Sequence, residues 1–126
     1  MVCDPEILRR IASGEMPKGD VLAVARIAGI AAAKRTPELL PLAHVIGVHG
    51  AAVDLTLGTE SIEVVATVRT ADRTGVEMEA LTAVQVGLLS VYDMCKAIDK
   101  GMIMGPTYLV EKEGGKSGHF VRSFVE

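Results

Sequence analysis

Aromatic residues are nearly absent from this chain of 126 residues, which contains two Phe, two Tyr and no Trp. Its core must therefore be built from aliphatic side chains and methionine, and apolar residues as a group still make up 49% of the sequence. That share is typical of a globular protein and excludes wholesale disorder. Because the length suits one hydrophobic core, we predict a single domain over residues 1–126.

Clustered positive charge is also missing from the sequence. The net charge is −3 and the sequence pI is about 5.6, whereas grooves that bind nucleic acid combine clustered Lys and Arg with stacking aromatic residues. We therefore exclude a nucleic-acid partner. Any anion that the protein binds has to be held by a local group of cations.

Cysteines and long apolar runs are scarce as well. Cys3 and Cys95 stand alone and no secretory signal is visible, so we expect reduced thiols and a cytoplasmic location. The most apolar stretch, residues 80–98, is typical of a buried helix and not of a membrane span, because five polar residues interrupt it. These are Thr82, Gln85, Ser90, Asp93 and Lys96.

Two helices are predicted in the first third of the chain. Residues 4–14 begin with Asp-Pro and end with Gly, which are start and stop signals of a short helix. Asp20 caps a second helix, which we expect to end near Arg35, because Thr36 precedes Pro37 and is pushed out of the helical conformation.

The remainder of the chain alternates between strands and one long helix. Residues 37–50 contain two prolines and predict an irregular connection. Residues 51–57 and 61–70 are rich in β-branched side chains and predict an antiparallel hairpin. A helix is expected from about Met78 to Lys100, and residues 106–120 begin as a strand and end in a Gly-rich loop.

This order of elements favours an α+β fold in which helices pack on one face of an antiparallel, ferredoxin-like sheet. Such a fold has a strand before its first long helix. Residues 1–3 are too few to form that strand, so we expect the first strand to be missing.

Polar residues of the long helix are predicted to share one stripe. At about 100° per residue, the five polar residues named above fall on it together with Glu79 and Lys100. The middle of the stripe holds only short polar groups, which favours a covered interface or cleft wall over a solvent-facing surface. The apolar arc is wider than one sheet can cover, so we predict a homo-oligomer.

Asp93 and Lys96 lie one helical turn apart. They are compatible with a simple surface ion pair worth a few tenths of a kcal/mol. They are also compatible with acid–base chemistry, provided that burial and neighbouring charges move their pKa values toward neutrality.

Three further lysines are candidates for anion binding. Lys112 and Lys116 belong to a Gly-rich loop whose backbone N–H groups can approach an anion. Lys18 precedes a helix start, where free N–H groups attract phosphate. A solvated loop is the commoner explanation for each. No zinc site is predicted, because His44, His49, Cys95 and His119 lack a compact spacing.

Three long segments together resemble one family. They are "KGDVLAVARIAGIAAAKRTPELLPLAHVI", "TGVEMEALTAVQVGLLSVYDMCKAIDKGM" and "LVEKEGGKSGHF", and they look like the MoaC family, the cyclic pyranopterin monophosphate synthases of molybdenum cofactor biosynthesis. The resemblance implies a lyase that rearranges 3',8-cyclo-7,8-dihydro-GTP and releases pyrophosphate. It also implies a hexamer, a trimer of dimers, with active sites at subunit interfaces.

Site residues follow from the same resemblance. It implies that Asp93 and Lys96 are catalytic. For their roles we expect Lys96 to be the main proton-transfer group and Asp93 to be either its orienting partner or the complementary acid–base group. It implies substrate contacts from two segments and three lysines, which are Leu42, Ala43, His44, Glu77, Met78, Glu79, Lys18, Lys112 and Lys116. No dedicated cofactor or metal cage is expected, and a magnesium ion is expected only as a companion of the substrate triphosphate.

The chain departs from the family pattern in two places. It reads "PLAHV" where members usually have "PLCHP", which keeps His44 but changes its neighbours. Members also begin with a segment that contains an additional strand and a basic residue near the site, and nothing here aligns with it. The alternative function is therefore a non-catalytic, oligomeric module that binds pterin nucleotides. An RNA-binding ferredoxin-like domain is disfavoured, because the strands lack stacking aromatics.

Overall fold

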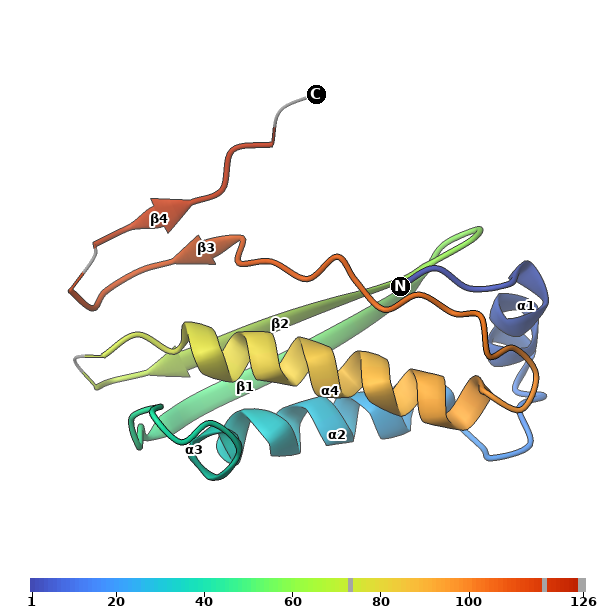
Figure 1. Ribbon diagram of the computed structural model, residues 1–126, viewed down its shortest axis with the longest axis horizontal. Helices are drawn as coiled ribbons and strands as arrows, with labels where there is room; N and C mark the ends of the chain where they lie inside the picture. The colour runs from blue at the N-terminus through green and yellow to red at the C-terminus, as the bar shows by residue number, and fades with distance from the viewer. Residues whose placement is uncertain (73, 117, 125–126) are drawn as a thin grey trace.

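The computed structural model describes residues 1–72, 74–116 and 118–124. Figure 1 shows a hairpin of two long strands covered on one face by two long helices, with a short hairpin at the C-terminal end set apart from it. The elements in chain order are α1 (Pro5–Ser13), α2 (Val21–Lys34), α3 (Thr36–Leu39), β1 (Val48–Leu57), β2 (Ile62–Thr70), α4 (Glu77–Cys95), β3 (Glu111–Lys112) and β4 (Phe120–Val121).

The predicted helix starts are confirmed by their caps. The Asp4 carboxylate accepts a hydrogen bond from the N–H of Glu6 at 2.8 Å, and the Asp20 carboxylate accepts one from the N–H of Ala23 at 3.1 Å. Gly14 ends α1 in the left-handed conformation, with φ 74°, which a residue with a side chain rarely adopts. Local chemistry alone therefore fixes where α1 and α2 begin.

The predicted hairpin is confirmed as an antiparallel β1–β2 pair. Val53 lies opposite Ala66, and the pairing runs without a shift from Gly50 to the turn. Alternate residues of β2 pack toward the helices while those between them stay exposed, as the period of two along a strand requires. The strand β1 begins three residues earlier than expected, at Val48.

The contact between α2 and α4 depends on small residues. The two helices lie side by side and run in opposite directions (Figure 1). Ala25, Gly29 and Ala33 of α2 are buried, as are Ala83 and Gly87 of α4. A Cβ on Gly29 would lie 2.9 Å from the Ala83 carbonyl oxygen, so only glycine permits this approach.

The expected end of the second helix near Arg35 is confirmed, because α2 ends at Lys34 and Arg35 caps it. Thr36 is not outside a helix, because it begins α3, where Pro37 fills a first-turn position that needs no N–H donor. The buried Thr36 hydroxyl lies 3.0 Å from the Ala32 carbonyl oxygen and 3.1 Å from that of Ala33. It thereby ties the start of α3 to the last turn of α2, inside the segment predicted to be irregular.

The helix α4 ends at Cys95 and not near Lys100. After Lys96, which caps the helix, the N–H groups of Ile98 and Asp99 both donate to the Cys95 carbonyl and close a turn. The Tyr92 hydroxyl donates to the Lys100 carbonyl at 2.9 Å and holds the chain in its new direction.

The ferredoxin-like sheet is not observed. The described strands form two separate pairs, β1–β2 and β3–β4, and the strand predicted from residue 106 is reduced to the two residues of β3. Among the described residues, the outer edge of β2 pairs with residues 1–3 at Ile62, and Val2 also pairs with Ile103. Beyond this short bridge, no described strand joins β2 to the segment that leads to β3. The coarser prediction, an antiparallel pair packed against helices in an α+β arrangement, is confirmed.

A search for membrane-spanning segments among the described residues finds no helix with the length and apolar character to cross a bilayer.

The close approach of α2 and α4 predicts opposite effects for two glycine substitutions. Gly29→Ala should lower the free energy of unfolding by about 1–3 kcal/mol, because its methyl group has to displace the backbone of α4. Gly87→Ala is the matched control: its Cβ meets Val64 at 3.6 Å, an ordinary contact, so helix propensity should leave stability equal or up to about 1 kcal/mol higher. Urea unfolding measures both, and equal effects would contradict the packing described.

Candidate active site

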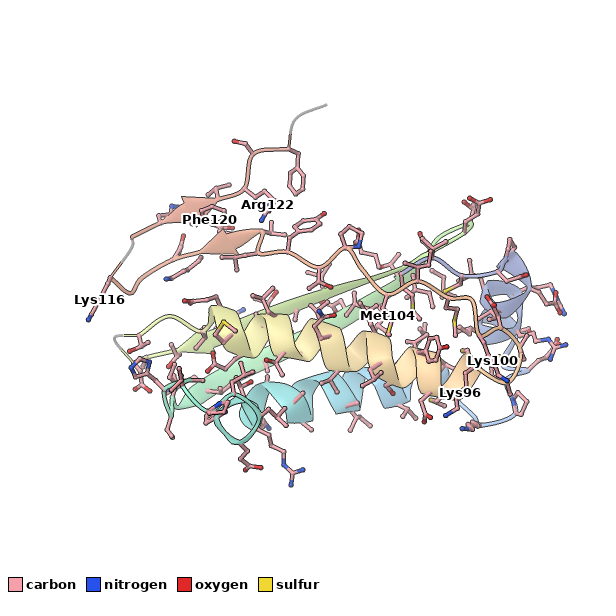
Figure 2. All side chains as sticks on the ribbon, in the orientation of Figure 1. Lys96, Lys100, Met104, Lys116, Phe120 and Arg122 are labelled. Atoms are coloured by element: carbon pink, nitrogen blue, oxygen red, sulfur yellow. The ribbon has the colours of Figure 1, made fainter. Side chains whose placement is uncertain are left out.

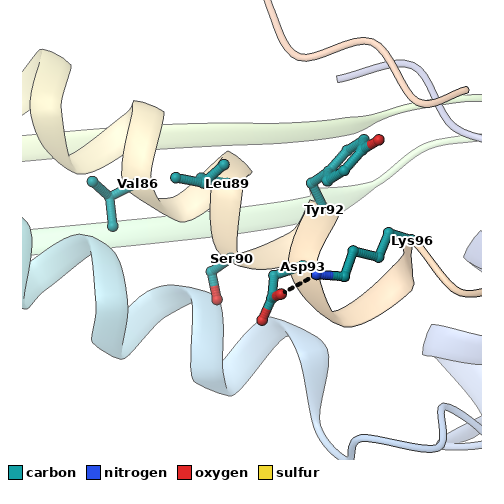
Figure 3. A pocket seen from close by; sticks show the side chains of 6 residues that line it. All are labelled: Val86, Leu89, Ser90, Tyr92, Asp93 and Lys96. Carbon is teal, nitrogen blue, oxygen red and sulfur yellow. Dashed lines mark hydrogen bonds and ion pairs between the residues drawn. The ribbon is translucent and has the colours of Figure 1, made fainter. Parts of the chain in front are cut away.

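Asp93 and Lys96 form an ion pair near the C-terminal end of α4. The Lys96 ammonium donates to the Asp93 carboxylate at 2.9 Å, and the two side chains are 49% and 60% exposed, respectively (Figure 3). The hydrogen bond from Lys96, followed by the charges of Lys18 and Lys96, lowers the pKa of Asp93 below its ordinary value. Asp93 is therefore a carboxylate at neutral pH and accepts hydrogen bonds there.

The pair lines a shallow cavity of about 430 Å³ on the outer side of α4. The remainder of its lining is Val86, Leu89, Ser90 and Tyr92, and Figure 3 shows these side chains along the helix surface beside Asp93 and Lys96. Leu89 is 54% exposed. One chain alone therefore supplies an open wall with an apolar lining, and not the enclosed, dry crevice that acid–base chemistry needs.

Lys18 also lies at this end of the molecule. Its ammonium lies 3.3 Å from the Asp93 carbonyl oxygen, although it comes from the turn before α2. Figure 2 shows Lys100 at the same end of the molecule as Lys96. Lys18 and Lys96 both act on the Asp93 carboxylate, so two cations meet one anion and the local charge is positive although the whole chain is negative. Such a cluster suits an anionic ligand.

A second group of predicted site residues lies at the opposite end of α4. The Lys112 ammonium, only 14% exposed, lies 3.4 Å from the Glu77 carboxylate. Glu79 is 2% exposed, and among the described residues its Oε2 and that of Glu77 have no hydrogen-bond partner. Burial, opposed by a backbone hydrogen bond and reinforced by the charge of Glu77, raises the pKa of Glu79.

The burial of Glu79 shows that residues of the predicted polar stripe do not share one environment along α4. Helical periodicity places Glu79 near Asp93 in angle, yet one side chain is buried and the other is exposed. Two other segments lie against α4: α3 contacts the helix, and the segment carrying Lys112 approaches Glu77 at its first residue. The N-terminal part of α4 is therefore covered on the side that stays open farther along.

The remaining predicted residues lie on exposed segments. Leu42 is 95% exposed, and His44 is exposed in the connection that follows α3. Ala43 is half-buried, and Met78 is 42% exposed in the first turn of α4. Figure 2 shows Lys116 at the tip of the C-terminal hairpin.

The length of α4 separates the two groups. An α-helix rises about 1.5 Å per residue, so Glu77 and Lys96 lie roughly 28 Å apart along the helix axis. Figure 2 shows Lys116 and Lys96 at opposite ends of the molecule. One chain brings Lys18 to Asp93 and Lys112 to Glu77, and it does not bring these two groups of residues together.

Comparison with known proteins identifies the family. The MoaC family model matches residues 1–115. The chain belongs to the MoaC family. It is 60% identical over 119 residues to the cyclic pyranopterin monophosphate synthase of Roseiflexus sp. (strain RS-1), and the match covers 93% of this chain and 75% of that protein.

Two further MoaC-family relatives carry the same name. The cyclic pyranopterin monophosphate synthase of Geotalea uraniireducens is 57% identical over 120 residues, which are 94% of this chain and 75% of the relative. That of Streptomyces avermitilis is 51% identical over 123 residues, which are 98% of this chain and 72% of the relative. The family predicted from the sequence motifs is therefore confirmed.

One cluster of possible metal ligands in this MoaC chain was not found from the sequence. Glu111, Glu113 and His119 bring their ligand atoms within 4.8 Å of one another on the C-terminal hairpin, and all three are exposed. His119 Nε2 lies 2.8 Å from the Glu111 carboxylate, so pairing between them accounts for this grouping. The spacing of His and Cys residues does not indicate this cluster, because two of its members are glutamates that flank Lys112 in the sequence.

The buried Glu79 predicts a pH-dependent stability. A carboxyl group whose pKa is raised by folding stabilises the fold fully below its unfolded pKa, and that contribution is lost as pH rises through the folded pKa. Glu79→Gln should therefore gain stability relative to the parent as pH increases from about 4.5 toward 8. Urea unfolding across this range measures the difference, with Glu63→Gln on β2 as the exposed control. A constant difference would contradict the burial of a titrating group.

Proposed function

We propose that Asp93 and Lys96 form the proton-transfer centre of this chain's cyclic pyranopterin monophosphate synthase activity. The activity itself follows from the family: relatives 51–60% identical over more than nine-tenths of the chain carry that name. The predicted enzyme and its place in molybdenum cofactor biosynthesis are thus confirmed. The roles of individual residues, given below, are the proposal.

Lys96 is the group that exchanges protons with the substrate. Its ammonium is held by a carboxylate that is ionised at neutral pH, so Asp93 orients Lys96 and compensates its charge when it is protonated. The reaction needs acid–base assistance at the guanine-derived ring. It also needs a ribose hydroxyl to attack the α-phosphate, which forms one P–O bond, breaks the bond to pyrophosphate and releases the hydroxyl proton.

Lysines neutralise the phosphates. The cyclised nucleotide triphosphate carries about four negative charges, and ammonium groups both bind it and stabilise charge on the leaving pyrophosphate. Lys18 is already beside Asp93. Lys112 and Lys116 come from the Gly-rich hairpin at the other end of the chain. A magnesium ion enters this proposal only together with the triphosphate, without a dedicated protein site.

The site is composite, built from two copies of the chain. The observation that supports this is the separation of roughly 28 Å between the ends of α4, which exceeds the reach of one small nucleotide. Exposed apolar side chains lie on the outer sides of both long helices, among them Ile27 at 68% and Leu89 at 54%. A second copy that covered these side chains would also enclose Asp93 and Lys96. A hexamer, as a trimer of dimers, supplies such interfaces.

His44, Glu77 and Glu79 position the pterin ring and the sugar. The orphan carboxylate oxygens of Glu77 and Glu79 provide acceptors, and a protonated Glu79 also provides a donor. The enzyme works in the cytoplasm in this proposal, which suits its two free, buried thiols.

Substitution of Lys96 tests the proton-transfer role. Lys96→Ala should reduce pyrophosphate release from the cyclised nucleotide by at least about 10²-fold, the usual contribution of a positioned acid–base group. Lys96→Arg should fail equally, because a guanidinium does not give up its proton at accessible pH. Thermal unfolding should be unchanged, since the side chain is half exposed.

Lys34→Ala, at the exposed end of α2, is the control for removing a lysine. Near-normal turnover by the arginine variant would contradict the proton-transfer role. If the parent chain bound the nucleotide and released no pyrophosphate, the non-catalytic binding module would be the better description.

A further inference from the structure

Both backbone groups of Gly47 are held by side chains from the end of β2. The Gly47 N–H donates to the Asp72 carboxylate at 2.7 Å, and the Thr70 hydroxyl donates to the Gly47 carbonyl at 2.7 Å. The N–H of Asp72 donates in turn to the Thr70 hydroxyl at 3.0 Å. We call these three hydrogen bonds the Gly47 clamp. It joins the connection between α3 and β1 to the segment that follows β2.

The Gly47 clamp lies where the β1–β2 pair ends. Val48 lies opposite Thr70 and Gly50 lies opposite Arg69, so His49 is an extra residue in β1. Such a bulge bends its strand and disrupts the regular pairing. The hydrogen bonds from Thr70 and to Asp72 therefore take over, one residue before β1, the task that backbone pairs perform within the hairpin.

His44 lies between two anchored points of the connection. On its N-terminal side the Ala43 N–H donates to the Leu40 carbonyl at 3.1 Å, directly after α3. On its C-terminal side Gly47 is held by the clamp. Only residues 44–46 lie between these points, and an extended chain spans about 3.5 Å per residue. The place of His44 therefore depends on both anchors.

The clamp also leads to the other residues that the proposed function assigns to the pterin ring and the sugar. Asp72 precedes Glu77, the first residue of α4, by five positions in the sequence. Figure 1 shows α3, the start of β1 and the start of α4 at the same end of the molecule. The clamp thus ties the connection that carries His44 to the segment that leads to Glu77 and Glu79.

We propose that Asp72 and Thr70 are positioning residues for substrate binding, which act through Gly47 by holding the connection that carries His44. This inference rests on the proposed function, which gives His44 a contact with the pterin ring or the sugar. The two residues act without touching the substrate. They raise the fraction of molecules in which the connection already has its binding conformation, and the apparent dissociation constant is the intrinsic one divided by that fraction.

Simple electrostatics predicts the opposite effect for Asp72. The nucleotide triphosphate is an anion, so removal of a carboxylate that merely repels it should tighten binding. Loss of the hydrogen bond to Gly47 should weaken binding instead. The direction of the change therefore separates a positioning role from a simple charge effect.

Calorimetric titration measures the dissociation constant directly. The probe is the cyclised nucleotide with a methylene group in place of the oxygen between its α- and β-phosphates, which binds and cannot release pyrophosphate. The dissociation constant should rise about five- to tenfold for Asp72→Ala, the effect of one or two lost hydrogen bonds. Thr70→Val should act alike, and it keeps a β-branched side chain in the strand. With the authentic substrate kcat should stay within about twofold, because saturation restores the binding conformation.

Conservative variants and a matched control complete the titration. Asp72→Asn keeps an acceptor oxygen and Thr70→Ser keeps the hydroxyl, so both should bind within about twofold of the parent. Asp54→Ala removes an exposed carboxylate from β1 and should not weaken binding. Unchanged or tighter binding by Asp72→Ala would overturn the proposal, and so would equal losses in the alanine and asparagine variants. A lower melting temperature with an unchanged dissociation constant would reduce the clamp to a structural feature and would also overturn it.

A double-mutant cycle tests whether Asp72 acts through His44. His44→Ala should weaken binding of the same probe, and Asp72→Ala in that background should add less than about twofold, because no contact remains to be positioned. A further fivefold loss, or unchanged binding by His44→Ala alone, would contradict the proposal. Lys96 is present in every one of these variants and the readout is binding. The proton-transfer role of Lys96 is therefore judged separately, by the turnover of its own variants.

Discussion

The helix α4 determines how the candidate site can be assembled, because it carries the two groups of predicted site residues at its opposite ends. Small residues let α2 and α4 approach so closely that a Cβ on Gly29 would lie 2.9 Å from the Ala83 carbonyl oxygen. The distance between the ends of α4 is fixed by helix geometry. A reaction that needs residues from both ends has to take them from different copies of the chain.

The charged groups at the two ends of α4 differ in their exposure to water. At the N-terminal end of α4 the protein has already removed Glu79 from water, and its carboxyl group holds a proton more tightly as a result. At the C-terminal end Asp93 and Lys96 remain half exposed, where water competes for both groups and weakens the ion pair. The same pair becomes strongly coupled once a second surface excludes water. Contact with a second copy of the chain would therefore strengthen the coupling between Asp93 and Lys96, which the single chain leaves exposed to water.

The sequence predicts what depends on near neighbours along the chain. Asp4 and Asp20 cap their helices as expected, and the β-branched run of residues 61–70 forms β2 with nearly the expected bounds. Periodicity could not predict the burial of Glu79, because an angle on a helical wheel does not say which other segment covers it. It could not predict α3 either, because the buried hydroxyl of Thr36 and the first-turn position of Pro37 outweigh the usual effect of proline on the residue before it. Motif resemblance predicted catalytic and substrate-binding residues as one set, whereas the structure places two of them, Glu77 and Lys96, at opposite ends of α4.

Mixing two inactive variants tests the composite site most directly. Chains with Lys96→Ala are denatured and refolded together with an equal amount of chains with Lys112→Ala, and pyrophosphate release from the cyclised nucleotide is measured. If each site takes Lys96 from one copy and Lys112 from another, random assembly restores up to about a quarter of the parental activity, although each variant alone is inactive. If one copy supplies both lysines, every site in the mixture is defective and no activity returns, which would contradict the account.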